Sequence, residues 1–394
     1  MCDVGARHCG RPGGGAEAAP HVPGGVMCAL RARPSSRLAG RFCGLRQTPL
    51  LGNRDSPKRG NELIFFVTVL RALAACLITN AHYEGIYPAD IIANGGLIGD
   101  IIFFAVSGYC LCNVKYELNV RGFGAWYGKR LWRVYPPVVV CTVVYILAGA
   151  YDIRAKGFFW WFIYPTNYHF VGSIVVLYVP FFFLMKIRVL RDNIGKVMVW
   201  IAAVWLSVYL SGYDKSHYHI DSVYEPMIRF LFMESMLLGA WFRINDKTLR
   251  NKGRKWSWMA AMGLFILYFG SKLAFSRCLQ LRQFQFLNQL IIFAFLFFVF
   301  RVFCGIDKKL EGMPGKVKRV IEFVSSITLE IYVVQYVLVS VIRGMRLVFP
   351  LSWLILSASI VASAFVLHTS CGLIYKGADS LILEILRRRE HRQK

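Results

Sequence analysis

The chain has 394 residues, of which 56% are hydrophobic and only 18% are charged, and its formal net charge is +25. A soluble globular protein carries about 25% charged residues, so this composition indicates a membrane protein. The positive charge does not indicate nucleic-acid binding, because the basic residues lie in short blocks between apolar runs and not on one soluble face.

The first 60 residues are rich in Gly, Pro and Arg and contain almost no aromatic residues. Such a segment cannot bury enough apolar surface to fold, so we expect a disordered basic tail over residues 1–60. It also lacks the apolar core of about 7–15 residues that marks a secretory signal peptide. Met27 is an alternative start to Met1, because nothing before it has a structural pattern.

Ten apolar segments follow the tail, and most approach the length of about 20 residues at which a helix crosses a bilayer. We therefore expect an all-α, polytopic membrane protein with about ten transmembrane helices. Its transmembrane domain is expected at 61–376, followed by a basic cytoplasmic tail at 377–394. The expected spans are residues 61–81, 95–114, 134–150, 168–185, 197–212, 225–242, 257–271, 284–304, 321–342 and 351–375.

Lys and Arg are distributed unequally between the two sides that these spans define. If the N-terminus is cytoplasmic, 37 of the 47 basic residues fall in the inside segments and 8 fall in the outside loops. Arg71 and Arg229, the remaining two, lie within spans. This is the asymmetry that the positive-inside rule predicts, so we expect both termini in the cytoplasm.

Four ionisable residues lie well inside the expected spans: Arg71, Arg229, Glu234 and Glu330. Each costs at least ~2.5 kcal/mol in hydrocarbon, so each is expected to face the bundle interior and to have a partner there. For Arg229 and Glu234, an internal salt bridge that fixes helix packing, such as Arg229 with Glu225, explains the residue as well as a functional role does.

Arg71 has a second polar residue, His82, on the same helix. Eleven residues correspond to about three helical turns and ~16 Å, so the two side chains point to the same side at different depths. With the N-terminus inside, Arg71 lies at mid-depth and His82 lies near the outer surface. A single histidine near a helix end is more often an interfacial residue than a catalyst, so His82 by itself does not identify a site.

The second span contains "IIFFAVSGYCL", residues 101–111. Small residues such as Ser107 and Gly108 let membrane helices approach closely, so we expect a packing role for both. Ser107 is also a candidate nucleophile, but the sequence places no base beside it, which makes this the weaker interpretation.

The next inside segment carries "KRLWRVYPP", residues 129–137, which we interpret as a loop that leads into the third span. Arg130 and Arg133 are three residues apart and therefore share one helical face at the cytoplasmic start of that span. Two guanidinium groups on one face suit a phosphate-rich ligand. Anchoring by inside-positive charge is the simpler explanation for most such pairs.

In combination these features resemble the acyltransferase 3 family, whose members are integral membrane enzymes that O-acylate extracytoplasmic carbohydrates. The Arg and His separated by ten residues, the "FF..SGY" segment and the R-x-x-R followed by proline occur in the order typical of the family. Two later segments also fit, "GSIVVLYVPFFFL" at 172–184 and "SSITLEIYVVQ" at 325–335. The resemblance covers roughly residues 61–375.

The resemblance implies transfer of an acyl group, by default acetyl, from cytoplasmic acyl-CoA to a hydroxyl of a cell-surface or lipid-linked carbohydrate. It places the protein in the plasma membrane, with membrane lipid, acyl-CoA and the carbohydrate as partners and with no bound cofactor. It implies that His82 acts as general base or acyl carrier and that Arg71 holds the donor or stabilises negative charge. Arg130 and Arg133 are then expected to bind the phosphates of CoA. The candidate supporting residues are Ser107, Gly108, Tyr109 and Glu330.

Two positions depart from the family pattern. Many members have a histidine near the position of Gln335, so a second imidazole is not expected there. The acidic residue that often directly precedes the FF pair is displaced here to Asp100, which we therefore leave out of the catalytic set. His169 and His368 are single histidines without a motif, and the sequence assigns them no role.

Two other classes of function also fit part of the pattern. A transporter or flippase of lipid-linked sugars needs a similar number of spans, but no inverted repeat is visible. A non-catalytic scaffold explains neither Arg71 nor the R-x-x-R motif. We expect no metal site, because "HYH" at 217–219, near Asp221, is more typical of a solvated loop. The 11 cysteines likewise contain no paired CxxC motif.

Overall fold

The computed structural model describes residues 58–59, 62–165, 168–245 and 254–392, and nearly all of the predicted tail 1–60 lies outside these residues. The described part is helical apart from one short antiparallel hairpin, β1 (Lys58–Arg59) with β2 (Glu62–Leu63). The helices are α2 (Phe65–Ala81), η1 (Asp90–Ile92), α3 (Gly96–Leu111), α4 (Val120–Leu147), α5 (Ile153–Phe158), η2 (Phe159–Ile163), α6 (His169–Lys186), α7 (Arg188–Asp192), α8 (Ile194–Gly212), α9 (Ile228–Ile244), α11 (Arg254–Arg277), η3 (Leu279–Phe284), α12 (Phe286–Glu311), α13 (Gly315–Ser326), α14 (Thr328–Gly344) and α15 (Leu351–Arg392).

Most of these helices are apolar enough to cross a membrane. Within the described residues, seven pass a test of length and composition, or up to eight if the bent pair α13 and α14 forms one span. Two other predicted spans correspond to α2 and α9, which have 17 residues each. The all-α, multi-pass membrane architecture is thereby confirmed, while a total of about ten spans and the side of each terminus stay predictions.

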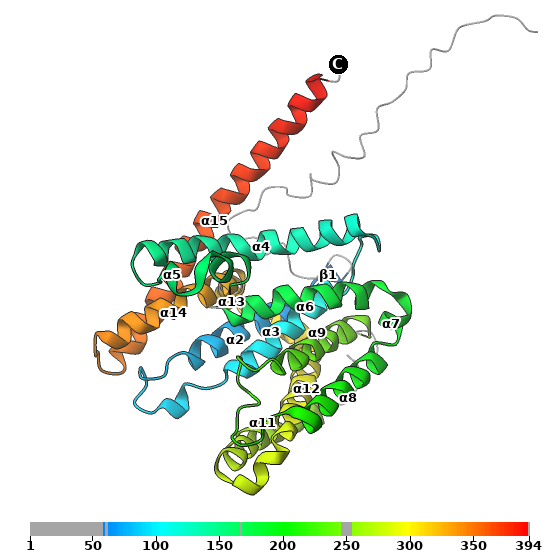
Figure 1. Ribbon diagram of the computed structural model, residues 1–394, viewed down its shortest axis with the longest axis vertical. Helices are drawn as coiled ribbons and strands as arrows, with labels where there is room; N and C mark the ends of the chain where they lie inside the picture. The colour runs from blue at the N-terminus through cyan, green and yellow to red at the C-terminus, as the bar shows by residue number, and fades with distance from the viewer. Residues whose placement is uncertain (1–57, 60–61, 166–167, 246–253, 393–394) are drawn as a thin grey trace, which may run out of the picture. The chain divides into compact units, whose positions relative to one another are not determined.

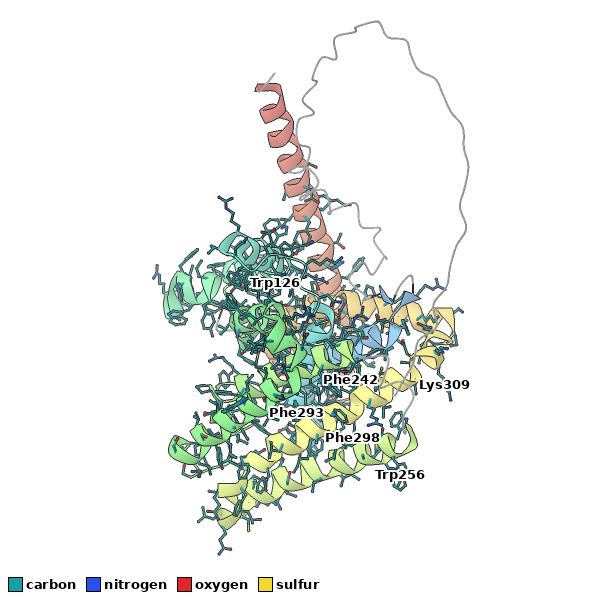
Figure 2. The ribbon with its side chains drawn as sticks, turned by 90° about the vertical axis from the view of Figure 1, so that its right-hand side faces the viewer. Trp126, Phe242, Trp256, Phe293, Phe298 and Lys309 are labelled. Atoms are coloured by element: carbon teal, nitrogen blue, oxygen red, sulfur yellow. The ribbon has the colours of Figure 1, made fainter. Side chains whose placement is uncertain are left out.

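The helices around α3 form the most closely packed part of the bundle. α3 lies along both α2 and α9, while α14 lies along α15 and beside α2 (Figure 1). Figure 2 shows α11 and α12 side by side, with Phe293 and Phe298 on α12. Because lipid cannot satisfy backbone polar groups, a membrane chain of this composition folds as helices that pack against one another.

Both ends of α2 are held by polar contacts with other elements. At its start, the Phe66 backbone N–H donates to the buried Asp307 carboxylate of α12 at 2.8 Å, which satisfies one of the free N–H groups of the first turn. At its end, the Asn80 amide donates to the carbonyl oxygens of Ile92 and Asn94 at 2.8 and 3.0 Å. The Tyr87 hydroxyl donates to the same Asn80 side chain at 2.7 Å. These contacts fix the position of α2.

The prediction of a loop over residues 129–137 is wrong, because α4 begins at Val120 and includes these residues. Asn119 caps this helix by accepting a hydrogen bond from the Gly122 N–H at 2.6 Å. Pro136 and Pro137 lie inside the helix and do not begin it. A membrane helix tolerates internal proline when neighbouring groups satisfy the freed backbone, so the proline pair did not mark a boundary.

Arg229 does not form the salt bridge with Glu225 that was one of the two explanations for its place in a span. Its guanidinium donates to the Tyr164 hydroxyl at 3.2 Å, and Glu225 instead lies 3.7 Å from the His219 ring. Glu225 lies three residues before the start of α9, where the chain is not helical. Glu234, further along α9, is buried, and its Oε1 has no hydrogen-bond partner among the described residues.

Candidate active site

Helix α2 carries the two residues that the sequence singled out. Arg71 lies in its second turn, and His82 is the residue that directly follows its last helical position. Both side chains are half-buried, so neither points freely into the surroundings of the bundle. The eleven-residue separation corresponds to ~16 Å along the axis, and the two residues therefore define separate ends of one helix face.

The Arg71 end meets the "SGYC" segment of α3. The Arg71 Nη2 lies 3.7 Å from Cys110 Sγ, a weak donor–acceptor contact with a polarisable sulfur. Cys110 directly follows Tyr109, a buried residue whose hydroxyl accepts a hydrogen bond from Arg243 at 3.4 Å. The "SGYC" segment of α3 is thus packed against α2 at the level of Arg71.

Arg130 and Arg133 of the R-x-x-R motif are related to Arg71 by a residue of α6 with which all three interact. The positive charges of Arg130, Arg133 and Arg71 all act electrostatically on the hydroxyl of Tyr178, a buried residue of α6. The Arg130 guanidinium also lies 5.7 Å from the centre of the Trp126 ring, within cation–π range. Three arginines from two helices are therefore close enough to one tyrosine to interact with it electrostatically.

An aromatic cluster surrounds His82 at the other end of α2. Its ring lies 5.0 Å from the Tyr336 ring, and the Tyr336 hydroxyl donates to that of Tyr332 at 2.7 Å. The Tyr332 hydroxyl in turn accepts from the Phe170 backbone N–H at 3.2 Å. The His169 imidazole, adjacent in sequence to Phe170, is close enough to His82 for the two to interact electrostatically.

A small cavity lies between these two ends. It is formed by α2, α3, α6 and α14, and neither Arg71 nor His82 is among its lining residues. α2 contributes three residues between Arg71 and His82 to its wall. Those walls are almost wholly apolar, so the space suits an uncharged part of a ligand and not a charged group. The lining residues are Ala75, Ile78, Thr79, Phe103, Phe170, Thr328, Leu329, Ile331 and Tyr332.

The predicted supporting residues fall in different places. Gly108 sits in the contact between α3 and α9, where an added Cβ would lie 1.8 Å from the Met236 carbonyl oxygen. Ser107 is half-buried on the same turn. Glu330 is buried on α14, and one of its carboxylate oxygens lies 2.8 Å from Nδ1 of His368 on α15. Gly108 and Glu330 thus support the bundle around the cavity and are not among the residues that line it.

A family model described as an acyltransferase domain matches residues 64–369, which is well over half of the chain. The chain belongs to the acyltransferase 3 family. No curated protein and no solved structure matches it. Family membership identifies the protein as a membrane acyltransferase, and the matched range contains Arg71, His82 and the residues that line the cavity.

The fold adds residues to the site of this acyltransferase that sequence reasoning missed. His169 is close enough to His82 to interact with it electrostatically, although the sequence assigned it no role. Asp100 is only 5% exposed, and its carboxyl group is close enough to Tyr332 and Tyr336 to interact electrostatically with both. The sequence could have indicated Tyr332 and Tyr336, because they are four residues apart and thus share one face of α14. No pattern in the sequence indicated His169, since its position relative to His82 depends on how α6 packs.

Proposed function

We propose that this acyltransferase moves an acyl group, by default acetyl, from cytoplasmic acyl-CoA to a hydroxyl of a cell-surface or lipid-linked carbohydrate at the plasma membrane. The observation that supports this most directly is the arrangement along α2. Arg71 at one end of the helix face interacts electrostatically with Tyr178, as Arg130 and Arg133 of α4 do, an imidazole lies at the other end, and α2 lines a small apolar cavity between them. Acyl-CoA has charged phosphates, a long uncharged arm and a terminal thioester in that order. These groups match the arginines, the apolar cavity and the imidazole, respectively.

The arginine end suits the phosphates of the donor. The Nε of Arg130 is buried and has no hydrogen-bond partner among the described residues. Its guanidinium group can therefore donate a further hydrogen bond to a ligand. Guanidinium groups bind phosphate in a bidentate manner, which makes Arg130 and Arg133 the proposed phosphate ligands. Arg71, on α2, would hold the donor on its way to the cavity. Its distance of ~16 Å from His82 is too long for direct stabilisation of an oxyanion there.

His82 would carry out the transfer at the other end. As general base, its imidazole takes the proton of the acceptor hydroxyl while that oxygen attacks the thioester carbonyl carbon. The carbon–sulfur bond then breaks, the imidazolium returns the proton to the leaving thiolate, and the products are an ester and the free thiol of CoA. As acyl carrier, His82 would first attack the thioester itself and then pass the acyl group to the hydroxyl. The tyrosines around His82 provide aromatic faces and hydroxyl groups of the kind that pack against sugars.

Replacing Arg130 or Arg133 with alanine is expected to raise the KM for acyl-CoA roughly 10- to 100-fold, because each change removes charge-assisted hydrogen bonds worth about 1.5–3 kcal/mol. The effect on kcat should be small, since neither residue lies at the His82 end. Steady-state kinetics on purified protein measure both parameters. Lys129→Ala is the matched control, because Lys129 is a neighbouring basic residue on α4 that is exposed. An unchanged KM in both arginine variants would rule out their phosphate role.

The proposed function is tested most simply with membranes that contain the protein and radiolabelled acetyl-CoA. We expect label to become covalently attached, through an alkali-labile ester, to polysaccharide, glycolipid or added glycan. A transporter of lipid-linked sugars would instead move sugar across the membrane without acquiring label. Membranes that lack the protein give the background, and label at that background level would contradict the proposed function.

A further inference from the structure

Helix α13 carries exposed apolar side chains next to charged ones. Four of its 12 residues are charged, which is too many for a helix that lies within hydrocarbon. Val317 and Val320 are nevertheless 44% and 61% exposed, and they share one face of the helix because they are three residues apart. An exposed apolar face beside a charged face is typical of a helix that lies in the interface between membrane and water.

The neighbours of α13 place it at one surface of the bundle. The Lys318 Nζ lies 5.6 Å from the centre of the ring of Phe65, the first residue of α2. The next residue, Phe66, is hydrogen-bonded to Asp307 near the end of α12. α13 is also bent by 68° from α14, the helix that follows it and lies beside α2. It therefore lies nearly across the axis of α14, at the surface where α2 begins and α12 ends.

Exposed basic side chains are concentrated at this surface. Lys316 and Arg319 are exposed on α13, and Lys308 and Lys309 are exposed in the last turn of α12. None of the four forms an ion pair with a carboxylate of the residues that the structure describes. The acidic residues of the same segment are buried or half-buried: Asp307, Glu311 and Glu322. The surface therefore presents positive charge to its surroundings.

An exposed tryptophan indicates that this surface lies at the level of the lipid headgroups. Trp256 of α11 is 76% exposed, and Figure 2 shows it at the same end of the pair α11 and α12 as Lys309. Tryptophan is enriched where the membrane meets water, because its ring is apolar and its N–H is polar. The basic residues around Lys309 are therefore within reach of the phosphates of lipid.

A phospholipid fits this surface better than a soluble anion does. Lys316 and Arg319 flank the face that exposes Val317 and Val320, so a ligand that contacts both faces needs a negative group and an apolar part. A phosphate without an acyl chain has only the first. The cavity along α2 has no lining residue from α13, so the acyl-transfer site does not account for these side chains.

We propose that α13 and the end of α12 bind anionic phospholipid of the surrounding bilayer. Val317 and Val320 lie among the acyl chains, and the headgroups contact the exposed basic side chains, which are Lys308, Lys309, Lys316 and Arg319. Juxtamembrane basic residues attract anionic lipid in this way. Because α13 packs on the first residue of α2, the bound lipid stabilises the start of that helix. The proposal does not depend on the acyl-transfer reaction.

The test titrates the full-length protein in neutral detergent with phosphatidylglycerol or with phosphatidylcholine, and native mass spectrometry counts the lipids bound. We expect tighter binding of phosphatidylglycerol. K316Q/R319Q should lower that affinity about 5- to 25-fold, since each basic residue near a membrane surface contributes roughly a factor of five. The matched control is R277Q/R346Q, which removes the same charge at the ends of α11 and α14 that lie away from α13, and it should bind as wild type.

Three results would overturn the lipid surface. The first is equal affinity of the wild-type protein for the two lipids, and the second is displacement of phosphatidylglycerol by inorganic phosphate, which would indicate a site for a free anion. The third is a preference for phosphatidylglycerol that K316Q/R319Q leaves unchanged. K308Q/K309Q replaces that variant if it fails to fold, and should also lose affinity. V317S/V320S keeps every charge and should bind phosphatidylglycerol more weakly, because its apolar contact with the acyl chains is lost.

Discussion

Replacing His82 with alanine is expected to lower kcat for acyl transfer by about 10²- to 10⁴-fold, the range that a positioned general acid–base contributes. The imidazole is the group next to the hydroxyl-rich cluster of Tyr336 and Tyr332, and alanine can neither take a proton nor carry an acyl group. Transfer of labelled acetyl to acceptor measures the loss. The amount of protein in the membrane should not change, because the half-buried side chain of His82 follows the last turn of α2.

Two comparisons make this result specific. His391→Ala removes a histidine elsewhere in the chain and should leave kcat unchanged, whereas Arg71→Ala should abolish transfer through loss of donor binding. Rapid quenching followed by mass spectrometry then separates the two roles of His82: an acyl group on the His82 peptide indicates a carrier, and its absence indicates a base. Normal turnover in His82→Ala would remove the core of the proposed mechanism.

Adding one methyl group at Gly108 or Gly239 is expected to destabilise the protein by about 1–3 kcal/mol or more, since the backbone itself must move. The two glycines form a reciprocal contact between α3 and α9. A Cβ at Gly108 would lie 1.8 Å from the Met236 carbonyl oxygen, and a Cβ at Gly239 would lie 1.8 Å from that of Ala105. Small residues allow such close approach of membrane helices. Thermal unfolding in detergent of Gly108→Ala and Gly239→Ala measures the loss.

The matched control for these two variants is Gly263→Ala on α11, where an added Cβ meets nothing within 4 Å. This control should be neutral or slightly stabilising, because alanine is the better helix former. A melting temperature of Gly108→Ala equal to that of Gly263→Ala would mean that the contact between α3 and α9 is looser than described. Activity should fall together with stability in the Gly108 variant, since α3 also contributes Phe103 to the cavity wall.

The parts of the site that follow from local geometry could be predicted from the sequence. Arg71 and His82 share a helix face because helical spacing alone determines it. The match of residues 64–369 to an acyltransferase domain likewise confirms the family that the order of the motifs suggested. The predicted spans fall on helices because long apolar segments must satisfy their backbone polar groups internally, although a total of about ten spans stays a prediction.

The parts that depend on packing could not be predicted. The start of α4 was misplaced because Pro136 and Pro137 resemble a helix boundary, although Asn119 caps the helix much earlier. The electrostatic interaction of His169 with His82 depends on where the bundle places α6 relative to α2, which no local pattern encodes. The electrostatic interaction of Arg71, Arg130 and Arg133 with Tyr178 was only partly foreseeable, since the segment 172–184 that contains this tyrosine was recognised without an assigned partner.

The central claim is that an acyl group passes along α2 from the arginine end to His82, and one measurement tests it directly. Sealed inverted vesicles with the acceptor enclosed are supplied from outside with radiolabelled acetyl-CoA, which does not cross the membrane. The account predicts ester-linked label inside the vesicles with the wild-type protein and none above background with His82→Ala. Enclosed acceptor that remains unlabelled with the wild-type protein, or that is labelled equally well with His82→Ala, would contradict it.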